Sequence, residues 1–254
     1  MKSHKQRLGR DMMRQAVQRA CAEMLEGRAY LAGLTIAQEN ALPGSPASEW
    51  DISGAGSSTI QGFATDISVN QGEQVDFKIE STAKYHINIY RLGYYGGMGA
   101  RKVGTIASSN TISVDQPNPL TNSSTGLIDC GNWSVTASWQ VPADATSGFY
   151  IAKLIRDDNP SLSSHIYFIV RNDTDGSDIL FQTSDTTWQA YNDWGGNSLY
   201  SGSPAGRAYK VSYNRPFNTR ANQYRRANPF CNEYPAIRWL ERNGYDVSYT
   251  TGID

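Results

Sequence analysis

Cysteine, histidine and charge are all scarce in this chain of 254 residues. Three cysteines (Cys21, Cys130 and Cys231) and three histidines occur, and none of them has the spacing of a CxxC or HExxH motif. A thiolate zinc site, a thioredoxin-like redox motif and a helical metalloprotease motif are therefore excluded. Glycine-rich phosphate loops and the GxSxG nucleophile motif are also missing, so the usual sequence signatures of nucleotide-binding proteins and serine hydrolases are absent.

The charge balance excludes further classes of partner. Charged residues make up 19% of the chain and the net charge is -1, which leaves no basic footprint for nucleic acid. No run of 18 apolar residues occurs, so we expect no membrane span. The 15 tyrosines and 23 glycines instead indicate a β-rich protein with many turns.

The N-terminal part has its own character. Residues 1–38 read as a helical segment, because apolar residues recur every four positions within 11–34. Arginine and glutamate interrupt this segment, so it lacks the apolar region of a secretory signal peptide and leaves the compartment undetermined. Residues 39–59 are rich in Gly, Ser and Pro and read as a linker or arm, which Trp50 is expected to pin to the rest of the protein.

Residues 60–173 alternate apolar with polar or small residues. Seven short segments of this kind are separated by turn clusters, which is typical of an immunoglobulin-like or fibronectin-like β-sandwich. Val75, Phe77 and Ile79 are predicted to share one buried face, as are Ile87 and Ile89.

The pattern changes over residues 174–254. The continuous apolar run "ILFQ" predicts a buried strand, "AYKVSY" a second, "NEYPAIRWLERNG" a helix and "YDVSYTT" a further strand, which together read as the beginning of a parallel α/β domain. A doubly wound sheet usually has more strands than this. We therefore expect a missing C-terminal segment or a partner to complete the sheet.

The stretch "SDTTWQAYNDWGG", residues 184–196, is unusually aromatic for the loop that it is expected to form at the end of a strand. Ligands of open α/β sheets bind at such strand ends, which makes Trp188, Asn192 and Trp194 candidate pocket residues. Three interpretations stay open: the rings pack structurally, they form a platform for sugars, or Tyr191 is a metal ligand or an acid–base group.

Several strings together resemble bacterial proteins related to the large (beta) subunit of N,N-dimethylformamidase. They include "INIYRLGYYGGMGARKV", "LIDCGNWSVTASWQVP", "DILFQTSDTTWQAYNDWGGNSLY" and "EYPAIRWLERNGYDVSYTTGID", and the resemblance extends over residues 45–254. It implies an amidohydrolase with one iron held by two tyrosinates and a glutamate. Fe(III) is a hard Lewis acid that suits such ligands and can activate both an amide carbonyl and a bound water.

The resemblance also suggests site residues. Tyr191 matches one tyrosinate, while Tyr150 and Tyr213 are alternatives for the second, and Arg215 is a candidate for orienting a substrate carbonyl or carboxylate. The glutamate is expected in an "HDE" string, which this sequence lacks. Asp185 or Asp193 in the loop could reach a neighbouring metal, whereas Glu233, at the start of the predicted helix, is expected to be a poor substitute.

Two classes of function follow. The first is an incomplete amidohydrolase whose full-length form cleaves C–N bonds of small amides, and which is expected to be inactive if Asp254 is its true end. The second is a non-catalytic surface or carbohydrate-binding module that contacts polysaccharide. Chains with similar strings resemble extracellular bacterial proteins, which favours an extracellular location.

Overall fold

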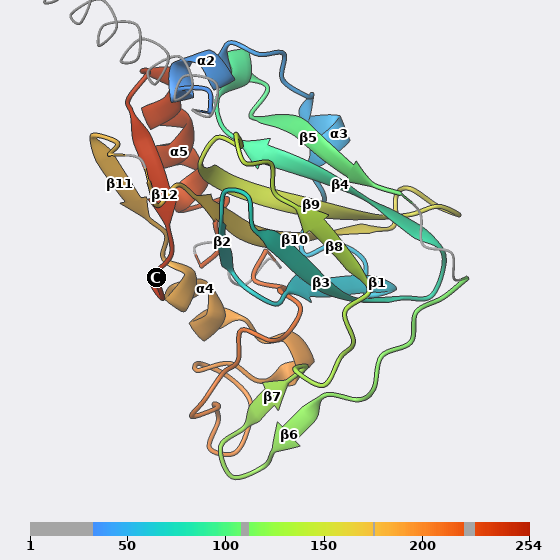
Figure 1. The fold of residues 1–254 in the computed structure, drawn as a ribbon. Coiled ribbons are helices and arrows are strands. Elements are labelled where there is room, and N and C mark those ends of the chain that lie inside the picture. Colours follow the sequence, from blue (N-terminus) through green and yellow to red (C-terminus); the bar gives the residue numbers. More distant parts are fainter. Residues whose placement is uncertain (1–32, 108–111, 175, 221–226) are drawn as a thin grey trace, which may run out of the picture. The chain divides into compact units, whose positions relative to one another are not determined.

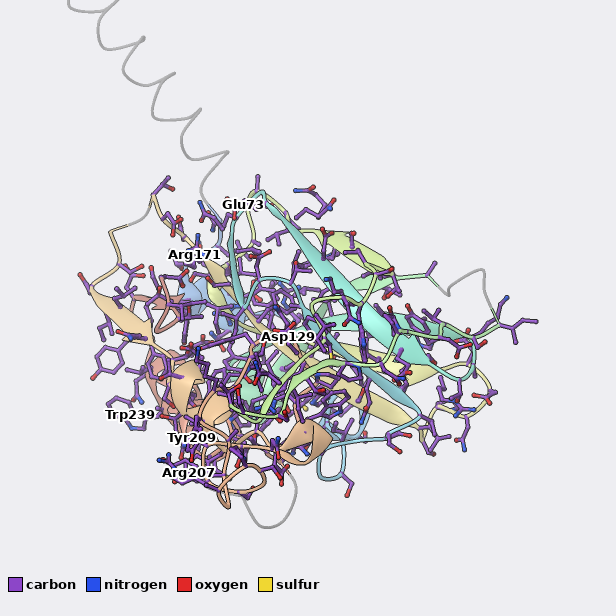
Figure 2. All side chains as sticks on the ribbon, turned by 90° about the horizontal axis from the view of Figure 1, so that it is seen from below. Glu73, Asp129, Arg171, Arg207, Tyr209 and Trp239 are labelled. Atoms are coloured by element: carbon purple, nitrogen blue, oxygen red, sulfur yellow. The ribbon has the colours of Figure 1, made fainter. Side chains whose placement is uncertain are left out.

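The computed structural model describes residues 33–107, 112–174, 176–220 and 227–254, whose side chains are drawn in Figure 2. Leu34–Asp254 form one compact unit. The helix predicted over residues 11–34 and Cys21 lie outside the described residues, except for the last two positions of that range. Within the described part of the chain, no helix is long and apolar enough to cross a membrane.

The described elements are mainly strands (Figure 1). The strands are β1 (Ile60–Ala64), β2 (Ser68–Asn70), β3 (Gln74–Ser81), β4 (Tyr85–Leu92), β5 (Ala100–Ile106), β6 (Leu120–Asn122), β7 (Leu127–Asp129), β8 (Ala137–Gln140), β9 (Gly148–Arg156), β10 (Ser163–Arg171), β11 (Ile179–Gln182) and β12 (Val247–Thr250). The helices are α2 (Ile36–Asn40), α3 (Ala47–Trp50), α4 (Asp185–Tyr191) and α5 (Glu233–Arg242), with 3₁₀ turns η1 (Tyr95–Gly97) and η2 (Trp194–Gly196).

Two larger sheets contain most of these strands (Figure 1). One has the order β2-β10-β9-β4-β5 and is antiparallel except for the β2–β10 pair. The other has the order β1-β3-β8 and is antiparallel throughout. In its register, Phe77 of β3 lies opposite Ala64 on one side and Ala137 on the other.

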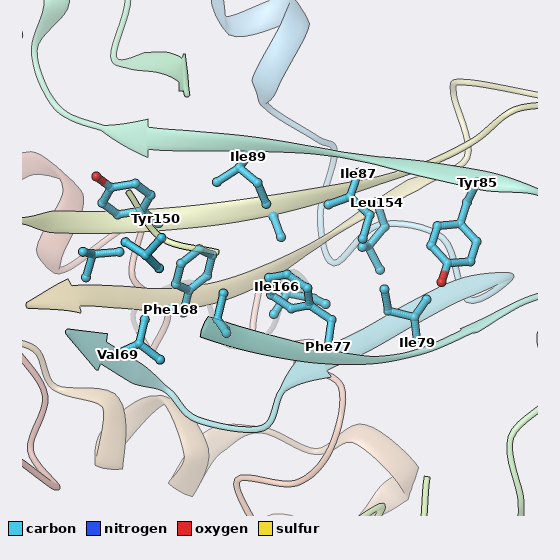
Figure 3. Close-up of a cluster of buried hydrophobic side chains, with 14 of the residues drawn as sticks. Val69, Phe77, Ile79, Tyr85, Ile87, Ile89, Tyr150, Leu154, Ile166 and Phe168 are labelled. Atoms are coloured by element: carbon cyan, nitrogen blue, oxygen red, sulfur yellow. The ribbon is translucent and has the colours of Figure 1, made fainter. Parts of the chain in front are cut away.

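The facing sides of these two sheets share one hydrophobic core (Figure 3). Val75, Phe77 and Ile79 of β3 are fully buried there, as are Ile87 and Ile89 of β4. Both predicted buried faces are therefore confirmed. They arise because side chains two positions apart along a strand point to the same side of a sheet.

A second core joins the C-terminal elements to the five-stranded sheet. Ile237 of α5 and Tyr249 of β12 pack in one cluster with Phe149 and Ile151 of β9 and with Trp188 of α4. β11 pairs in parallel with β12, and α5 lies between them in the sequence. Both strands and the helix form as predicted, but β11 is not the buried strand that was expected, since its residues alternate between half-buried and exposed and Leu180 is 68% exposed. α5 ends before a left-handed glycine as expected, since Gly244 has φ 72°.

Two local predictions are wrong. Residues 185–191, expected as a loop, form α4, and residues 208–213, expected as a strand, are irregular. The amides of Ala208 and Tyr209 donate to the carbonyls of Ser198 and Thr125 in neighbouring loops, so they do not extend a sheet. Trp50 lies where it was expected: its ring is 3% exposed and its Nε1 donates to the Met98 carbonyl at 3.1 Å.

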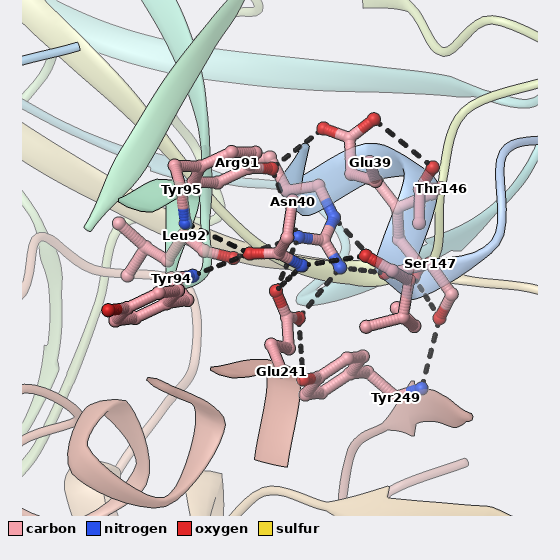
Figure 4. Close-up of polar contacts among 12 residues, drawn as sticks. Glu39, Asn40, Arg91, Leu92, Tyr94, Tyr95, Thr146, Ser147, Glu241 and Tyr249 are labelled. Carbon is pink, nitrogen blue, oxygen red and sulfur yellow. Dashed lines mark hydrogen bonds and ion pairs between the residues drawn. The ribbon is translucent and has the colours of Figure 1, made fainter. Parts of the chain in front are cut away.

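A buried ion pair links β4 to α5 (Figure 4). Arg91 donates to both carboxylate oxygens of Glu241, at 2.8 and 2.9 Å, and neither side chain is exposed. Tyr249 and Asn40 each donate a further 2.8 Å bond to Glu241. Burial disfavours the charged form of Arg91, but the attraction of Glu241 outweighs it and raises the pKa of the guanidinium well above its usual value.

Candidate functional site

Polar side chains gather where β11 and β12 end. Parallel strands end at the same edge of their sheet, so Asp185, which follows β11, meets Gly252, which follows β12. The Asp185 carboxylate is fully buried and accepts three bonds: from the Gly252 amide at 2.6 Å, the Tyr213 hydroxyl at 2.7 Å and the Thr183 hydroxyl at 3.1 Å. These donors offset the cost of removing the carboxylate from water.

A second carboxylate, Glu233, reaches the same edge. Its Oε1 accepts bonds from the Ser184 hydroxyl, from the Ser184 amide at 3.1 Å and from Nε1 of Trp188 at 3.0 Å. Its Oε2 is buried without a hydrogen-bond partner among the described residues. From the sequence, Glu233 was expected to be a poor substitute for the missing glutamate. Topology could have found it, because a helix leading into the second of two parallel strands begins at the edge where those strands end.

The spacing along α4 determines which side chains face inward. Counted from Asp185, three further inward-facing residues follow at three, four and seven positions: Trp188, Gln189 and Asn192. All four side chains are buried. Tyr191 is six residues beyond Asp185. At 100° per residue it is turned away from that face, so it projects in a different direction from Asp185.

Tyr213 closes one side of a small cavity next to this cluster. The cavity is about 30 Å³ and also has Trp188, Gln189, Arg215 and Phe217 in its wall, together with residues of β1 and β10. Burial and the hydrogen bond to Asp185 together raise the pKa of Tyr213 well above its usual value. The phenol is therefore neutral near pH 7 and acts as a donor to Asp185.

Arg215 braces the polypeptide that follows α4. It is 1% exposed and donates to four main-chain carbonyls, those of Gln189 (3.4 Å), Asn192 (2.5 Å), Trp194 (3.1 Å) and Asn197 (2.8 Å). Burial lowers its pKa to about 10. Its two terminal nitrogens hold the turn in place, while the side chain also lines the cavity.

The other two candidate tyrosines have different surroundings. Tyr150 is buried in the core between the two sheets and donates a 2.7 Å bond to the Thr146 carbonyl (Figure 3). Tyr191 stacks on Tyr200, with ring centroids 4.0 Å apart, and hydrogen bonding to Tyr200 raises its pKa. Of the three tyrosines, it is Tyr213 that contacts the carboxylate at the strand ends.

The remaining pocket candidates connect segments. Trp188 is 1% exposed and packs against Phe149 with ring centroids 5.6 Å apart. Asn192 is fully buried and donates to the Pro216 carbonyl at 3.0 Å, which joins α4 to the 216–218 segment. Trp194 is half-buried, and its Nε1 donates to Gln61 of β1 at 2.9 Å. All three are thus packed into the structure.

The donor chemistry near Asp185 suits a hard cation in type. Phenol and carboxylate oxygens of Tyr213 and Asp185 lie 2.7 Å apart, and Fe(III) prefers such ligands. Among the described residues, no group of three or more His, Cys, Asp and Glu side chains is arranged to hold a metal. Any iron bound at this edge would therefore depend on tyrosine as well as on carboxylate.

The sequence match extends across this edge and most of the β-sheet region. Residues 86–254 match the family described as N,N-dimethylformamidase beta subunit-like, C-terminal. The chain belongs to this family. The match includes the ion pair of β4 with α5, all of α4 and the carboxylates at the strand ends, whereas the cavity wall supplied by β1 lies before the matched residues.

The other comparisons add little to the family assignment. No curated protein matches the chain. Among solved structures, the chain is similar to an uncharacterized protein from Bacillus anthracis strain Ames, determined at 1.4 Å resolution. The two share 14% identity, the match covers 43% of this chain and 84% of that one, and the TM-score is 0.26. Such a weak likeness carries no argument about function.

Proposed function

We propose that this chain contributes to an amidohydrolase that cleaves C–N bonds of small or terminal amides, as its family membership suggests. The observation that carries the proposal is the Asp185–Tyr213 pair at the edge where two parallel strands end. Ligand sites of open α/β sheets lie at this edge. Glu233 adds a carboxylate oxygen that has no partner among the described residues.

We infer the finer architecture from the strand order. The two larger, mainly antiparallel sheets correspond to an immunoglobulin-like or fibronectin-like sandwich over residues 60–173. β11, α5 and β12 correspond to the first elements of an α/β domain over residues 174–254. In this arrangement the first domain supplies cavity walls from β1 and β10, and the second supplies the polar groups.

We further propose that the cofactor is iron, held by tyrosine and carboxylate oxygens. When bound, it would polarise the amide carbonyl and acidify a water. Tyr213 and Asp185 are the best placed ligands, whereas Tyr191 projects away from Asp185 on the same helix and stacks on Tyr200. Tyr150 is the weaker candidate, since burial raises its pKa and its hydroxyl is already bonded to a core carbonyl.

An iron titration tests this proposal. Tyrosinate bound to Fe(III) gives a purple-red absorption band, which should appear when Fe(III) is added to the purified protein. The band should be lost in Tyr213→Phe and remain in Tyr209→Phe, whose ring is 52% exposed at the surface (Figure 2). Amine release from N,N-dimethylformamide and other small formamides then measures the reaction. A folded wild-type protein that gives no band with Fe(III) would refute the iron site.

A second function is favoured by exposed aromatic rings. Tyr200, Tyr209 and Trp239 are each more than half exposed, and Trp239 stacks on Tyr245. Such rings can pack on the apolar faces of sugars, as in a non-catalytic carbohydrate-binding module. Retarded migration in gels that contain polysaccharide, abolished by Trp239→Ala and unaffected by metal removal, would support this alternative over the hydrolase.

A further inference from the structure

Arg215 is a buried cation that Asp193 attracts without forming an ion pair with it. Its guanidinium forms no ion pair with any described residue, and its bonds from Nη1 and Nη2 go to neutral main-chain carbonyls. A buried charge of this kind is costly unless an opposite charge compensates it. The site therefore has an electrostatic preference for an anion.

One donor of Arg215 is unused. The Nε atom is buried and has no hydrogen-bond partner among the described residues. Arg215 also lines the cavity of about 30 Å³ next to Tyr213. Because the terminal nitrogens are all occupied by carbonyls, Nε–H is the donor that the side chain has left to offer a ligand there.

The walls of the cavity limit what that ligand can be. Apart from Tyr213 and Gln189, the wall is mainly apolar, with Phe63, Ala64, Ile67, Ile166 and Phe217 among its residues. A volume of 30 Å³ is about twice what one water needs, which suits a ligand of about three non-hydrogen atoms. A small anion with few or no apolar atoms fits a cavity of this volume and lining.

We propose that this cavity is a subsite for a small carboxylate such as formate, bound through Nε–H of Arg215. The choice of carboxylate rests on the proposed function, since hydrolysis of a formamide releases formate. The carboxylate accepts a charge-assisted bond from Arg215 and compensates its charge. The negative charge of Asp185 does not face the bound carboxylate directly. Oδ2 of Asp185 is bonded to the Tyr213 hydroxyl, and it is the neutral Tyr213 that lines the cavity.

The test fills the cavity and leaves Arg215 intact, because replacing Arg215 would also remove its four carbonyl bonds. Ala64→Leu adds a larger side chain to the cavity wall. Ala137→Leu is the matched control. Ala64 of β1 and Ala137 of β8 are the two cross-strand neighbours of Phe77, and both are partly buried against the same core. Sodium formate is titrated into the metal-free full chain at constant ionic strength, and the NMR signal of Arg215 Nε–H is followed.

We expect a saturable shift of this signal with a Kd of about 1 mM, the tightest that a ligand of three atoms normally reaches. Ala64→Leu should raise the Kd by about tenfold or more and Ala137→Leu by less than about twofold. An unmoved Nε–H signal, equal binding of chloride, or an Ala64→Leu protein that binds formate as the wild type does would each overturn the subsite. Binding is measured without iron and without turnover, so a protein that binds formate but gives no Fe(III) band would refute the iron site and leave the subsite standing.

Discussion

The Tyr213 hydroxyl donates a 2.7 Å hydrogen bond to Oδ2 of Asp185, across 28 residues of sequence. This contact ties the irregular segment around Tyr213 to the end of β11. It also gives a buried carboxylate one of its three donors, since the other two come from Thr183 and Gly252. The same pair of oxygens would serve a metal, so its structural and chemical roles must be separated by experiment.

The structural role of this bond can be measured with Tyr213→Phe. Loss of one donor to a buried carboxylate should lower the free energy of unfolding by about 2 kcal/mol. Urea denaturation of the metal-free protein gives this value. Tyr209→Phe, on a half-exposed ring, should change it by less than about 0.5 kcal/mol. Equal effects of the two substitutions would show that Asp185 does not depend on Tyr213.

The buried pair of Arg91 and Glu241 predicts strong coupling between β4 and α5. Glu241→Gln alone should cost about 3–5 kcal/mol, because it leaves Arg91 charged and buried without a carboxylate. The double variant Arg91→Met/Glu241→Leu should lose less stability than the sum of the losses in Arg91→Met and in Glu241→Leu measured singly. A thermodynamic cycle of the three variants, measured by chemical denaturation, gives the coupling. Additive effects would contradict the pairing.

Acid should destabilise the protein through His165. Burial lowers the pKa of this histidine from 6.5 to about 3, and its Nε2 lies 2.8 Å from the Trp50 carbonyl. The unfolded state therefore takes up a proton below pH 6.5 that the folded state refuses. The free energy of unfolding should fall by up to about 1.4 kcal/mol per pH unit between pH 6.5 and 3 from this residue alone.

His165→Gln isolates this effect, because glutamine retains a donor for the Trp50 carbonyl and does not titrate. The stability advantage of the wild type over the variant, measured by urea denaturation, should shrink steadily as the pH falls from 7 to 4. A constant difference over this range would mean that His165 is not held neutral by burial.

Two glycines of the turn after β4 provide a matched steric test. Gly99 has φ 89°, and a Cβ there would collide with the Tyr234 hydroxyl and crowd Trp50. Gly96 has φ 63°, and a Cβ there would meet open space. Gly96→Ala should cost about 1 kcal/mol through its backbone conformation alone, and Gly99→Ala at least about 2 kcal/mol more. Thermal unfolding of the two variants decides; similar costs would contradict the close contact with Tyr234.

Strands and helices could be predicted from the sequence where the periodic pattern of hydrophobic residues coincides with the pattern of burial. β3, β4, β9 and β10 alternate or run apolar along their length, and the structure has a strand at each. α5 combined a buried apolar face with a glycine stop, so its limits were also predictable. In each of these cases the local pattern and the tertiary packing favour the same structure.

Prediction from the sequence failed where tertiary contacts, and not local propensity, determine the secondary structure. α4 contains two threonines, a tryptophan and a tyrosine, all with modest helix propensity, and it is held by its buried Asp185 and Trp188. The segment 208–213 has the composition of a strand, yet the amides of Ala208 and Tyr209 bond to the loop carbonyls of Ser198 and Thr125. Glu233 was expected to be a poor ligand because it lies at the start of a helix, yet that position brings it against Ser184, 49 residues earlier.

The anchoring of residues 34–50 has a consequence for proteolysis. Glu39 forms a two-pronged ion pair with Arg101, Asn40 donates to Glu241, and Trp50 is buried in the second core. The following residues, 51–59, form turns in which Ser53, Gly54, Gly56 and Ser58 are exposed, so a protease can reach them. A cut there would leave the two pieces bound to each other without a covalent link. The nicked chain would behave as a two-fragment complex that separates only on denaturation.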